Sequence, residues 1–370
     1  MKLIYIANIR LPTEKAHGIQ IMKTCEAFSN AGHEVQLVVP QRKNKITQDP
    51  FDFYRVKRIF SITRLFTLDL VHLGPLGFIV ESLVFSLSVL WKVRRVTSAK
   101  DFMFYSRDEM TAFFLSLMNK KVVWEAHMGH NNFFIRSLIR RDTLIVCISH
   151  GLSDFYCSLG AKRLMVSPDG VDLEQFQITD TKESARAKLG LPQETKLVVY
   201  TGHLYSWKGA DTLADAASTL ERGTLVLFVG GTENDIELFK GKYGEKGNVM
   251  ILGNKPHDSI PLYLRAADVL ALPNSGKEKI SQLYTSPMKL FEYMASGTPI
   301  VASDLPSLRE VLNDKNAVLV PPDSPMELAR GLKELLADRG KASALARQAL
   351  GDVEQYDWEK RAGGILSFIS

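Results

Sequence analysis

The chain repeats one local pattern in both of its halves: a short apolar run, a polar loop, and a segment with apolar residues at helical spacing. In the first half, an apolar strand over Lys2–Ala7 precedes a polar loop, and residues 19–28 then give one apolar helical face that Gly32 ends. Val35–Pro40 reads as the next buried strand. Buried strands joined by helices are typical of a parallel sheet, because each parallel connection needs a crossover.

The same alternation returns in the second half of the chain. Two strands, Leu197–Gly202 and Thr224–Gly230, flank a helical segment over Gly209–Leu220. Further short apolar runs predict later strands at Val249–Leu252, Val269–Leu272, Thr298–Ala302 and Ala317–Val320. The predicted fold class is therefore α/β, with two doubly wound Rossmann-like domains.

Pro and Gly interrupt the pattern at Ser167–Asp172, and we place the joint between the domains there. We expect an N-terminal domain over residues 1–168 and a C-terminal domain over 169–355. The last segment, 356–370, has the apolar spacing of a helix, and we expect that helix to pack back toward the N-terminal domain.

Composition restricts the class of protein. Hydrophobic residues make up 45% of the chain and charged residues 24%, as in soluble globular proteins. The three cysteines are too few for a disulfide scaffold and fit a reducing compartment. The apolar run at the N-terminus is too short for a signal peptide, so we expect a cytoplasmic protein.

The longest apolar stretch, Leu76–Trp91, contains Glu81 and falls short of the roughly 20 residues of a membrane span. We predict a core helix there in preference to membrane contact. Residues 1–170 nevertheless carry a net charge of +9, against −4 for residues 171–370. The basic residues around the apolar stretch could rest on anionic lipid or form a solvated face; they are Arg55, Lys57, Arg58, Arg64, Lys92, Arg94 and Arg95. The chain lacks the aromatic and basic pattern of nucleic-acid binders.

One helix start combines groups that suit an anionic ligand. Ser286 is a good N-cap and Pro287 fits the first helical position, while Gly297 ends the helix. Lys289 and Glu292 share a face one turn in. The amides and the lysine suit a diphosphate, and the glutamate suits ribose hydroxyls. An ordinary capped helix with a surface ion pair fits this stretch equally well.

In their order and spacing, five motifs resemble the retaining glycosyltransferases of family 4. The motifs are Pro168–Asp172, Thr201–Gly209, Leu252–Asn254, Ala267–Val269 and Ser286–Glu310. The resemblance runs through nearly the whole chain. It implies the GT-B fold, in which two Rossmann-like domains face a central cleft. It also implies transfer of a hexose-type sugar from a nucleotide diphosphate sugar to a glycan or lipid-linked glycan acceptor.

The resemblance assigns Lys208 to the donor diphosphate and Glu292 to the ribose. His203 stands where family members usually have an arginine, and it lacks the bidentate fork of a guanidinium. Tyr284 stands where a first glutamate, which touches the donor sugar, is usual. The remaining donor-binding residues implied by the resemblance are Gly18, Gly231, Lys255, Ser286, Pro287, Met288 and Lys289.

In the first half, His127 resembles the family histidine near the donor sugar, with His130 as an alternative. The expected catalytic residues are therefore His127, Lys208 and Glu292. His17 and Arg107 are candidates for the acceptor side.

We expect a front-face mechanism that uses neither a metal ion nor a cofactor. The expected partners are the nucleotide sugar, the acceptor in polysaccharide biosynthesis, and peripherally the anionic inner face of the plasma membrane, but no nucleic acid. Two alternatives stay open: a catalytically silent nucleotide-binding partner of a glycan-synthesis complex, which Tyr284 and His203 suggest, and a GT-B sugar-nucleotide epimerase.

Overall fold

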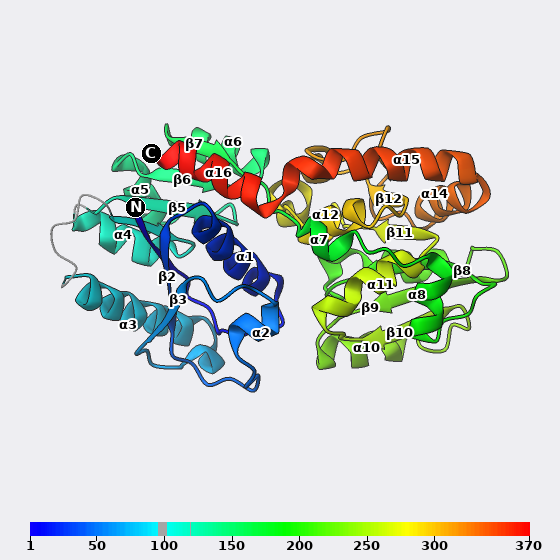
Figure 1. The fold of residues 1–370 in the computed structure, drawn as a ribbon, viewed down its shortest axis with the longest axis horizontal. Helices are drawn as coiled ribbons and strands as arrows, with labels where there is room; N and C mark the ends of the chain where they lie inside the picture. Colours follow the sequence, from blue (N-terminus) through cyan, green and yellow to red (C-terminus); the bar gives the residue numbers. More distant parts are fainter. Residues whose placement is uncertain (95–101, 119) are drawn as a thin grey trace. The chain divides into compact units, whose positions relative to one another are not determined.

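The computed structural model describes residues 1–94, 102–118 and 120–370, and these form two compact units (Figure 1). Unit 1 consists of Met1–Pro168 and Trp358–Ser370, and unit 2 consists of Asp169–Asp357. Each unit is a parallel sheet with helices around it. The predicted fold class of two parallel-sheet α/β domains is confirmed.

Unit 1 is built on a seven-stranded parallel sheet in the order β3-β2-β1-β4-β5-β6-β7. Its strands are β1 (Lys2–Ile6), β2 (Glu34–Pro40), β3 (Ser61–Leu65), β4 (Phe102–Ser106), β5 (Val122–Ala126), β6 (Leu144–Cys147) and β7 (Leu164–Val166). Its helices are α1 (Ala16–Asn30), α2 (Pro50–Tyr54), α3 (Gly74–Arg94), α4 (Glu109–Leu117), α5 (Phe133–Arg140), α6 (His150–Ser158), α16 (Trp358–Ile369) and the 3-10 helix Val71–Leu73. The strand order reverses between β1 and β4, so the carboxyl ends of these two strands mark the switch point at which such sheets bind ligands.

Unit 2 repeats this topology in a six-stranded sheet, in the order β10-β9-β8-β11-β12-β13. Its strands are β8 (Lys196–Thr201), β9 (Thr224–Val229), β10 (Val249–Gly253), β11 (Val269–Leu272), β12 (Ile300–Ser303) and β13 (Val318–Val320). Its α-helices are α7 (Leu173–Phe176), α8 (Lys182–Leu189), α9 (Ala210–Ala217), α10 (Glu233–Tyr243), α11 (Ile260–Ala266), α12 (Met288–Ala295), α13 (Pro306–Arg309), α14 (Pro325–Ala337) and α15 (Arg339–Asp352). The shorter helical turns are Ser206–Lys208, His257–Ser259, Ile280–Tyr284 and Val353–Tyr356. Here the order reverses between β8 and β11, which places the switch point of unit 2 at their carboxyl ends.

The C-terminal helix α16 belongs to unit 1, where it lies beside α1 (Figure 1). Trp358 and Ile365 are buried on its inner face. Arg361 donates from Nε to the carbonyl oxygen of Pro168 at 2.8 Å, which ties the helix to the last residue of the main segment of unit 1.

The start of α12 differs from the prediction. The helix begins at Met288 and Pro287 is its N-cap, while Ser286 lies outside the helix. The Ser286 hydroxyl oxygen instead accepts the backbone N–H of Asp169 at 2.9 Å. The expectation of a serine cap was wrong because a residue 117 positions away in the sequence claims the hydroxyl.

The prediction of a core helix over Leu76–Trp91 was right about the helix and wrong about its burial. The segment lies in α3, which runs along the outer edge of unit 1 (Figure 1). Residues Val71–Arg94 are long and apolar enough to cross a membrane, yet only 33% of the most apolar window is buried. Leu76 is 78% exposed and Trp91 is 65% exposed. Arg95, one of the basic residues noted in the sequence, lies outside the described residues.

The close approach of two loops in unit 2 depends on Gly230. Gly230 has a φ of +124°, and a Cβ atom on it would lie 2.4 Å from the carbonyl oxygen of Gly202. We expect Gly230→Ala to destabilise the protein by about 1–3 kcal/mol through backbone strain alone. Urea unfolding followed by circular dichroism measures the change.

Gly241→Ala in α10 is the matched control, because no atom lies within 4 Å of its added Cβ. This control should stabilise the protein by roughly 0.5–1 kcal/mol, since alanine replaces glycine inside a helix. Equal unfolding midpoints for the two variants would contradict the packing described here.

Candidate functional site

The carboxyl edge of the unit 2 sheet gathers four polar loops. They follow the neighbouring strands β10, β9, β8 and β11. The loops after β8 and β9 touch, since the Gly202 N–H donates to the Val229 carbonyl at 2.8 Å. Because ligands bind outside the carboxyl ends of parallel strands, this edge is the first place to look for a site.

Lys289 stands at this edge, in the first turn of α12. Its side chain is nearly enclosed, its Nζ donates to the Thr201 carbonyl at 3.3 Å, and it lies 3.9 Å from the centre of the Tyr200 ring. Burial and the nearby Lys208 ammonium hold the pKa of Lys289 well below its usual range, and Glu292 partly offsets this effect. Gly202 passes this ammonium group without a side chain, so the loop after β8 can approach it closely.

Lys208 ends the 3-10 turn that follows β8, with Nζ 4.0 Å from the centre of the Trp207 ring. Burial lowers the pKa of Lys208 to about 8. Among the described residues, no carboxylate offsets this effect of burial on the pKa of Lys208. Two desolvated ammonium groups that repel each other are an arrangement that a bound anion stabilises.

Glu292 lies one turn after Lys289 and is 7% exposed. It accepts a hydrogen bond from His257 Nε2 at 2.9 Å, and Gln175 donates to His257 Nδ1 at 3.3 Å. These two contacts assign the ring proton to Nε2 and fix the orientation of the carboxylate. The sequence gave no sign of this contact between His257 and Glu292.

Other predicted residues of unit 2 take distinct positions. The His203 ring stacks on Tyr205 at 4.9 Å between ring centres, beside the Lys208 turn. Gly231 has a φ of +98°, and Lys255 is half-buried in the loop after β10. Met288 is buried at the first position of α12. The structure therefore brings most of the predicted donor residues to one edge of the sheet.

Asn274 is a residue of this edge that sequence reasoning missed. It is fully buried in the loop after β11, and among the described residues neither atom of its amide finds a hydrogen-bond partner. A Cβ atom on Gly209 would lie 3.4 Å from the Asn274 backbone nitrogen, so the Asn274 backbone lies close to the Lys208 turn. A polar residue directly after a buried strand was the available signal. A buried amide of this kind is costly unless something else satisfies it.

Unit 1 gathers charges around Glu125, which is fully buried at the end of β5. Its Oε1 accepts from three side chains: Gln20 at 2.6 Å, Arg361 at 2.7 Å and His127 at 3.0 Å. Burial by itself would raise the pKa of Glu125, but the Arg361 guanidinium and His127 hold that pKa well below its usual range. Glu125 is therefore a buried carboxylate with its counter-charge on the C-terminal helix.

Glu125 also sets the state of His127. Burial and the Arg107 guanidinium lower the pKa of His127 to about 4, so the ring is neutral at pH 7. Donation from Nε2 to Glu125 leaves Nδ1 as an acceptor, by assignment from the contacts. His130, the alternative histidine, is exposed. The geometry thus favours His127 over His130 as an acceptor for a hydroxyl.

The predicted acceptor residues lie close to His127. Burial is the main reason why the pKa of His17 is lowered to about 3. Arg107 and His127 lower it further. Arg107 Nη1 donates to Gln20 Oε1 at 2.7 Å. Packing alone requires glycine at position 18, because a Cβ atom there would lie 2.1 Å from the Tyr54 hydroxyl oxygen.

Replacing Glu125 tests the buried network. Glu125→Gln leaves the Arg361 guanidinium buried without its counter-charge, so we expect the free energy of unfolding to fall by about 3–5 kcal/mol. Glu327→Gln is the control, since it removes an exposed pair with Arg330 at 2.6 Å and should cost at most about 1 kcal/mol. Urea unfolding compares the two variants, and a similar loss in both would argue against the network.

Comparison with known proteins gives this geometry a context. Residues 181–351 match the family model described as glycosyl transferases group 1. The D-inositol 3-phosphate glycosyltransferase of Xylanimonas cellulosilytica is 28% identical over 239 residues, which cover 61% of this chain and 56% of that protein. The putative teichuronic acid biosynthesis glycosyltransferase TuaC of Bacillus subtilis is 28% identical over 191 residues, which cover 51% and 46%. The chain spans about half the length of the curated relatives it matches.

Solved structures match the chain over its full length. HepE of Anabaena in complex with UDP has a TM-score of 0.76 at 15% identity, covering 99% of both chains. Sucrose-phosphate synthase of Thermosynechococcus elongatus has a TM-score of 0.80 at 18% identity, covering 99% of this chain and 98% of that one. At this identity the likeness shows the fold alone. Residues 181–351 are thus similar in sequence to the group 1 glycosyltransferases, and the whole chain shares the fold of these solved structures.

Proposed function

We propose that the protein is a retaining glycosyltransferase of family 4, which transfers a hexose-type sugar from a nucleotide diphosphate sugar to a glycan or lipid-linked glycan. The observation that carries the proposal is the pair of desolvated ammonium groups of Lys208 and Lys289 at the carboxyl edge of unit 2. The HepE structure, which has the same fold, contains UDP, and a nucleotide fits this combination of charge and loops.

The donor would be held by charge and by directed hydrogen bonds. Lys208 and Lys289 would neutralise the diphosphate, together with the first amides of α12 at Met288 and Lys289. Glu292, oriented by His257, would accept the ribose hydroxyls. His203 would supply a weaker contact beside Lys208 than an arginine does. Gly231 and Lys255 would border the nucleotide.

The transfer step would be a front-face displacement. The bond from the anomeric carbon to the phosphate oxygen breaks, and a bond to the acceptor oxygen forms on the same face. The acceptor proton passes to the departing phosphate. Negative charge grows on that phosphate, so the two ammonium groups would stabilise the transition state more than the bound donor. The proposal assigns no step to a metal ion or a cofactor.

Residues of unit 1 would contact the sugars. The neutral His127 would accept a hydrogen bond from a donor sugar hydroxyl through Nδ1, because Glu125 takes its Nε2 proton. His17 and Arg107 would serve the acceptor.

We place the reaction in polysaccharide biosynthesis, in the cytoplasm and at the inner face of the plasma membrane. The name of the relative TuaC, which refers to teichuronic acid biosynthesis, supports a polysaccharide product.

A catalytically silent nucleotide-binding partner is the second candidate. Tyr284 favours it, because this residue is buried in the helical turn Ile280–Tyr284 where family members usually present a glutamate to the donor sugar. A sugar-nucleotide epimerase is the third candidate, and its product would identify it.

A panel of sugar nucleotides tests these candidates. We expect slow hydrolysis of one donor, and we expect Lys208→Ala and Glu292→Ala each to lower its rate by roughly 10²–10³-fold, as removal of a charge-stabilising group does. Lys333→Ala, which changes an exposed lysine of α14, should leave the rate unchanged. The released nucleoside diphosphate is measured by chromatography.

Binding without turnover for every donor and acceptor would support the silent partner. Release of an epimerised nucleotide would support the epimerase.

A further inference from the structure

Exposed apolar side chains concentrate on one part of unit 1. Of the nineteen large hydrophobic side chains that are exposed in the described structure, twelve lie between Ile59 and Trp91. Five of them form one stripe along α3, at a spacing of three or four residues, and we call these residues the apolar stripe: Leu76, Ile79, Leu83, Leu87 and Trp91. Monomeric soluble proteins rarely expose a continuous apolar surface of this kind, so the stripe calls for an occupant.

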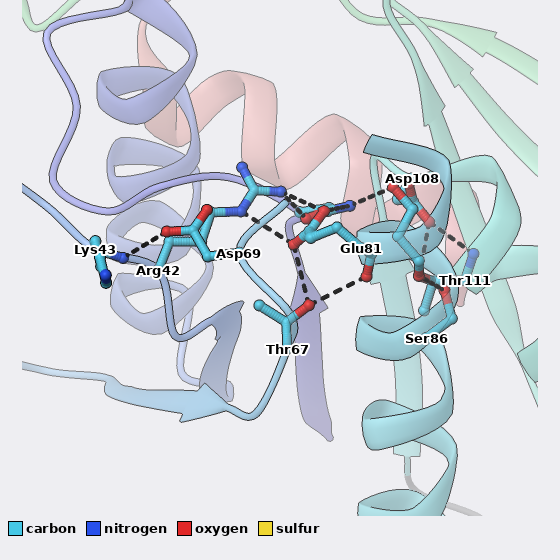
Figure 2. Close-up of polar contacts among 10 residues, drawn as sticks. Arg42, Lys43, Thr67, Asp69, Glu81, Ser86, Asp108 and Thr111 are labelled. Atoms are coloured by element: carbon cyan, nitrogen blue, oxygen red, sulfur yellow. Dashed lines mark hydrogen bonds and ion pairs between the residues drawn. The ribbon is translucent and has the colours of Figure 1, made fainter. Parts of the chain in front are cut away.

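The inward face of α3 carries the buried polar side chains Glu81, Ser82 and Ser86, next to the buried apolar side chains Phe85, Val89 and Val93. Figure 2 shows Glu81 of α3 with Arg42 and Thr67 around it. Glu81 is fully buried and receives two hydrogen bonds from Arg42, at 2.6 and 3.0 Å, and one from Thr67 at 3.3 Å. One turn further along, Ser86 and the Thr111 hydroxyl lie 2.8 Å apart. Polar contacts therefore hold α3 in place with its apolar stripe outward.

These anchors decide how α3 can meet a lipid bilayer. Within Val71–Arg94 the most apolar 18-residue window has a mean hydropathy of 1.9, and the segment is long enough to cross a membrane. Crossing would pull Glu81 away from Arg42 and leave a charge in hydrocarbon, which is costly. A helix that stays docked can instead lie in the plane of the interface, with its apolar face among the lipid headgroups and upper acyl chains.

The charge around the stripe selects an anionic surface. Residues 51–100 contain eight lysines and arginines and three acidic residues, one of which is the buried Glu81. Arg64 is exposed two residues before Phe66, whose carbonyl oxygen accepts a hydrogen bond from Ser88 of α3. Lys92 and Arg94 close the C-terminal end of the helix. A second copy of this chain would bring like charges together, whereas anionic lipid offers the opposite charge.

We propose that unit 1 docks on an anionic lipid bilayer through α3. The helix lies parallel to the surface, the apolar stripe inserts between the headgroups, and Arg64, Lys92 and Arg94 meet the lipid phosphates. Trp91 sits at the level of the headgroups, as interfacial tryptophans do. This docking does not depend on the reaction proposed above, although it would bring a lipid-linked acceptor to the protein.

Vesicle co-sedimentation of the full chain tests the proposal. We expect binding to vesicles of phosphatidylcholine with phosphatidylglycerol, weaker binding to phosphatidylcholine alone, and release at high salt. The double variant Leu83→Gln with Leu87→Gln should bind at least about tenfold more weakly, because two inserted side chains are lost. Both positions are exposed, so circular dichroism should show an unchanged fold.

The matched control changes two exposed apolar residues of unit 2, Leu238→Gln with Met326→Gln, and should bind vesicles like the unmodified chain. Anionic vesicles should also shift the tryptophan emission to shorter wavelength, and Trp91→Phe should remove most of that shift.

Three results would overturn the proposal. They are no co-sedimentation with anionic vesicles, equal vesicle binding by the stripe variant and the control variant, or equal binding to vesicles with and without phosphatidylglycerol. A dimer that forms without lipid and is lost in the stripe variant would also overturn it, since a second copy would then cover the stripe. Sugar-nucleotide turnover without vesicles separates these failures from a failure of the proposed reaction.

Discussion

The candidate donor site depends on two ammonium groups that have been taken out of water at the end of a parallel sheet. Burial lowers the pKa of both Lys208 and Lys289, and the Lys208 ammonium group lowers the pKa of Lys289 further. A folded chain keeps such an arrangement at a cost in stability, which an anionic ligand reverses. Gly230 lets two loop backbones meet at this edge, because a Cβ atom on it would lie 2.4 Å from the Gly202 carbonyl oxygen. The close approach of the loops and the buried charge lie at the same edge, as expected of a binding site.

Unit 1 uses buried ion pairs for a different purpose. The Glu125–Arg361 contact joins residues 236 positions apart in the sequence. The same carboxylate accepts from Nε2 of His127 and so fixes the proton on that ring. The Glu81–Arg42 contact orients α3 and leaves its apolar side exposed. In both places a buried ion pair fixes the orientation of the residues around it. Fixing that orientation explains the presence of these pairs better than a gain in stability does.

The sequence predicted the fold because the apolar runs and helical spacings are local signals. The strand Val269–Leu272 was predicted residue for residue as β11. Predictions failed where a distant partner decides the outcome: Ser286 serves the Asp169 amide instead of capping α12, and Arg42 turns Glu81 of α3 inward. Lys289 and Glu292 of the candidate donor site could be predicted from their spacing in one motif. The contact between His257 and Glu292 joins segments far apart in the sequence, so a single sequence carries no sign of it.

Calorimetry of nucleoside diphosphates binding to the full chain at pH 8, in two buffers of different ionisation enthalpy, tests the central claim most directly. At this pH Lys208 is about half protonated, and a bound diphosphate favours its charged form. The account predicts that binding takes up protons and that Lys208→Ala lowers the uptake, with Lys289 left to contribute the rest. No heat with any nucleotide, or binding whose proton balance is the same in Lys208→Ala, would contradict it.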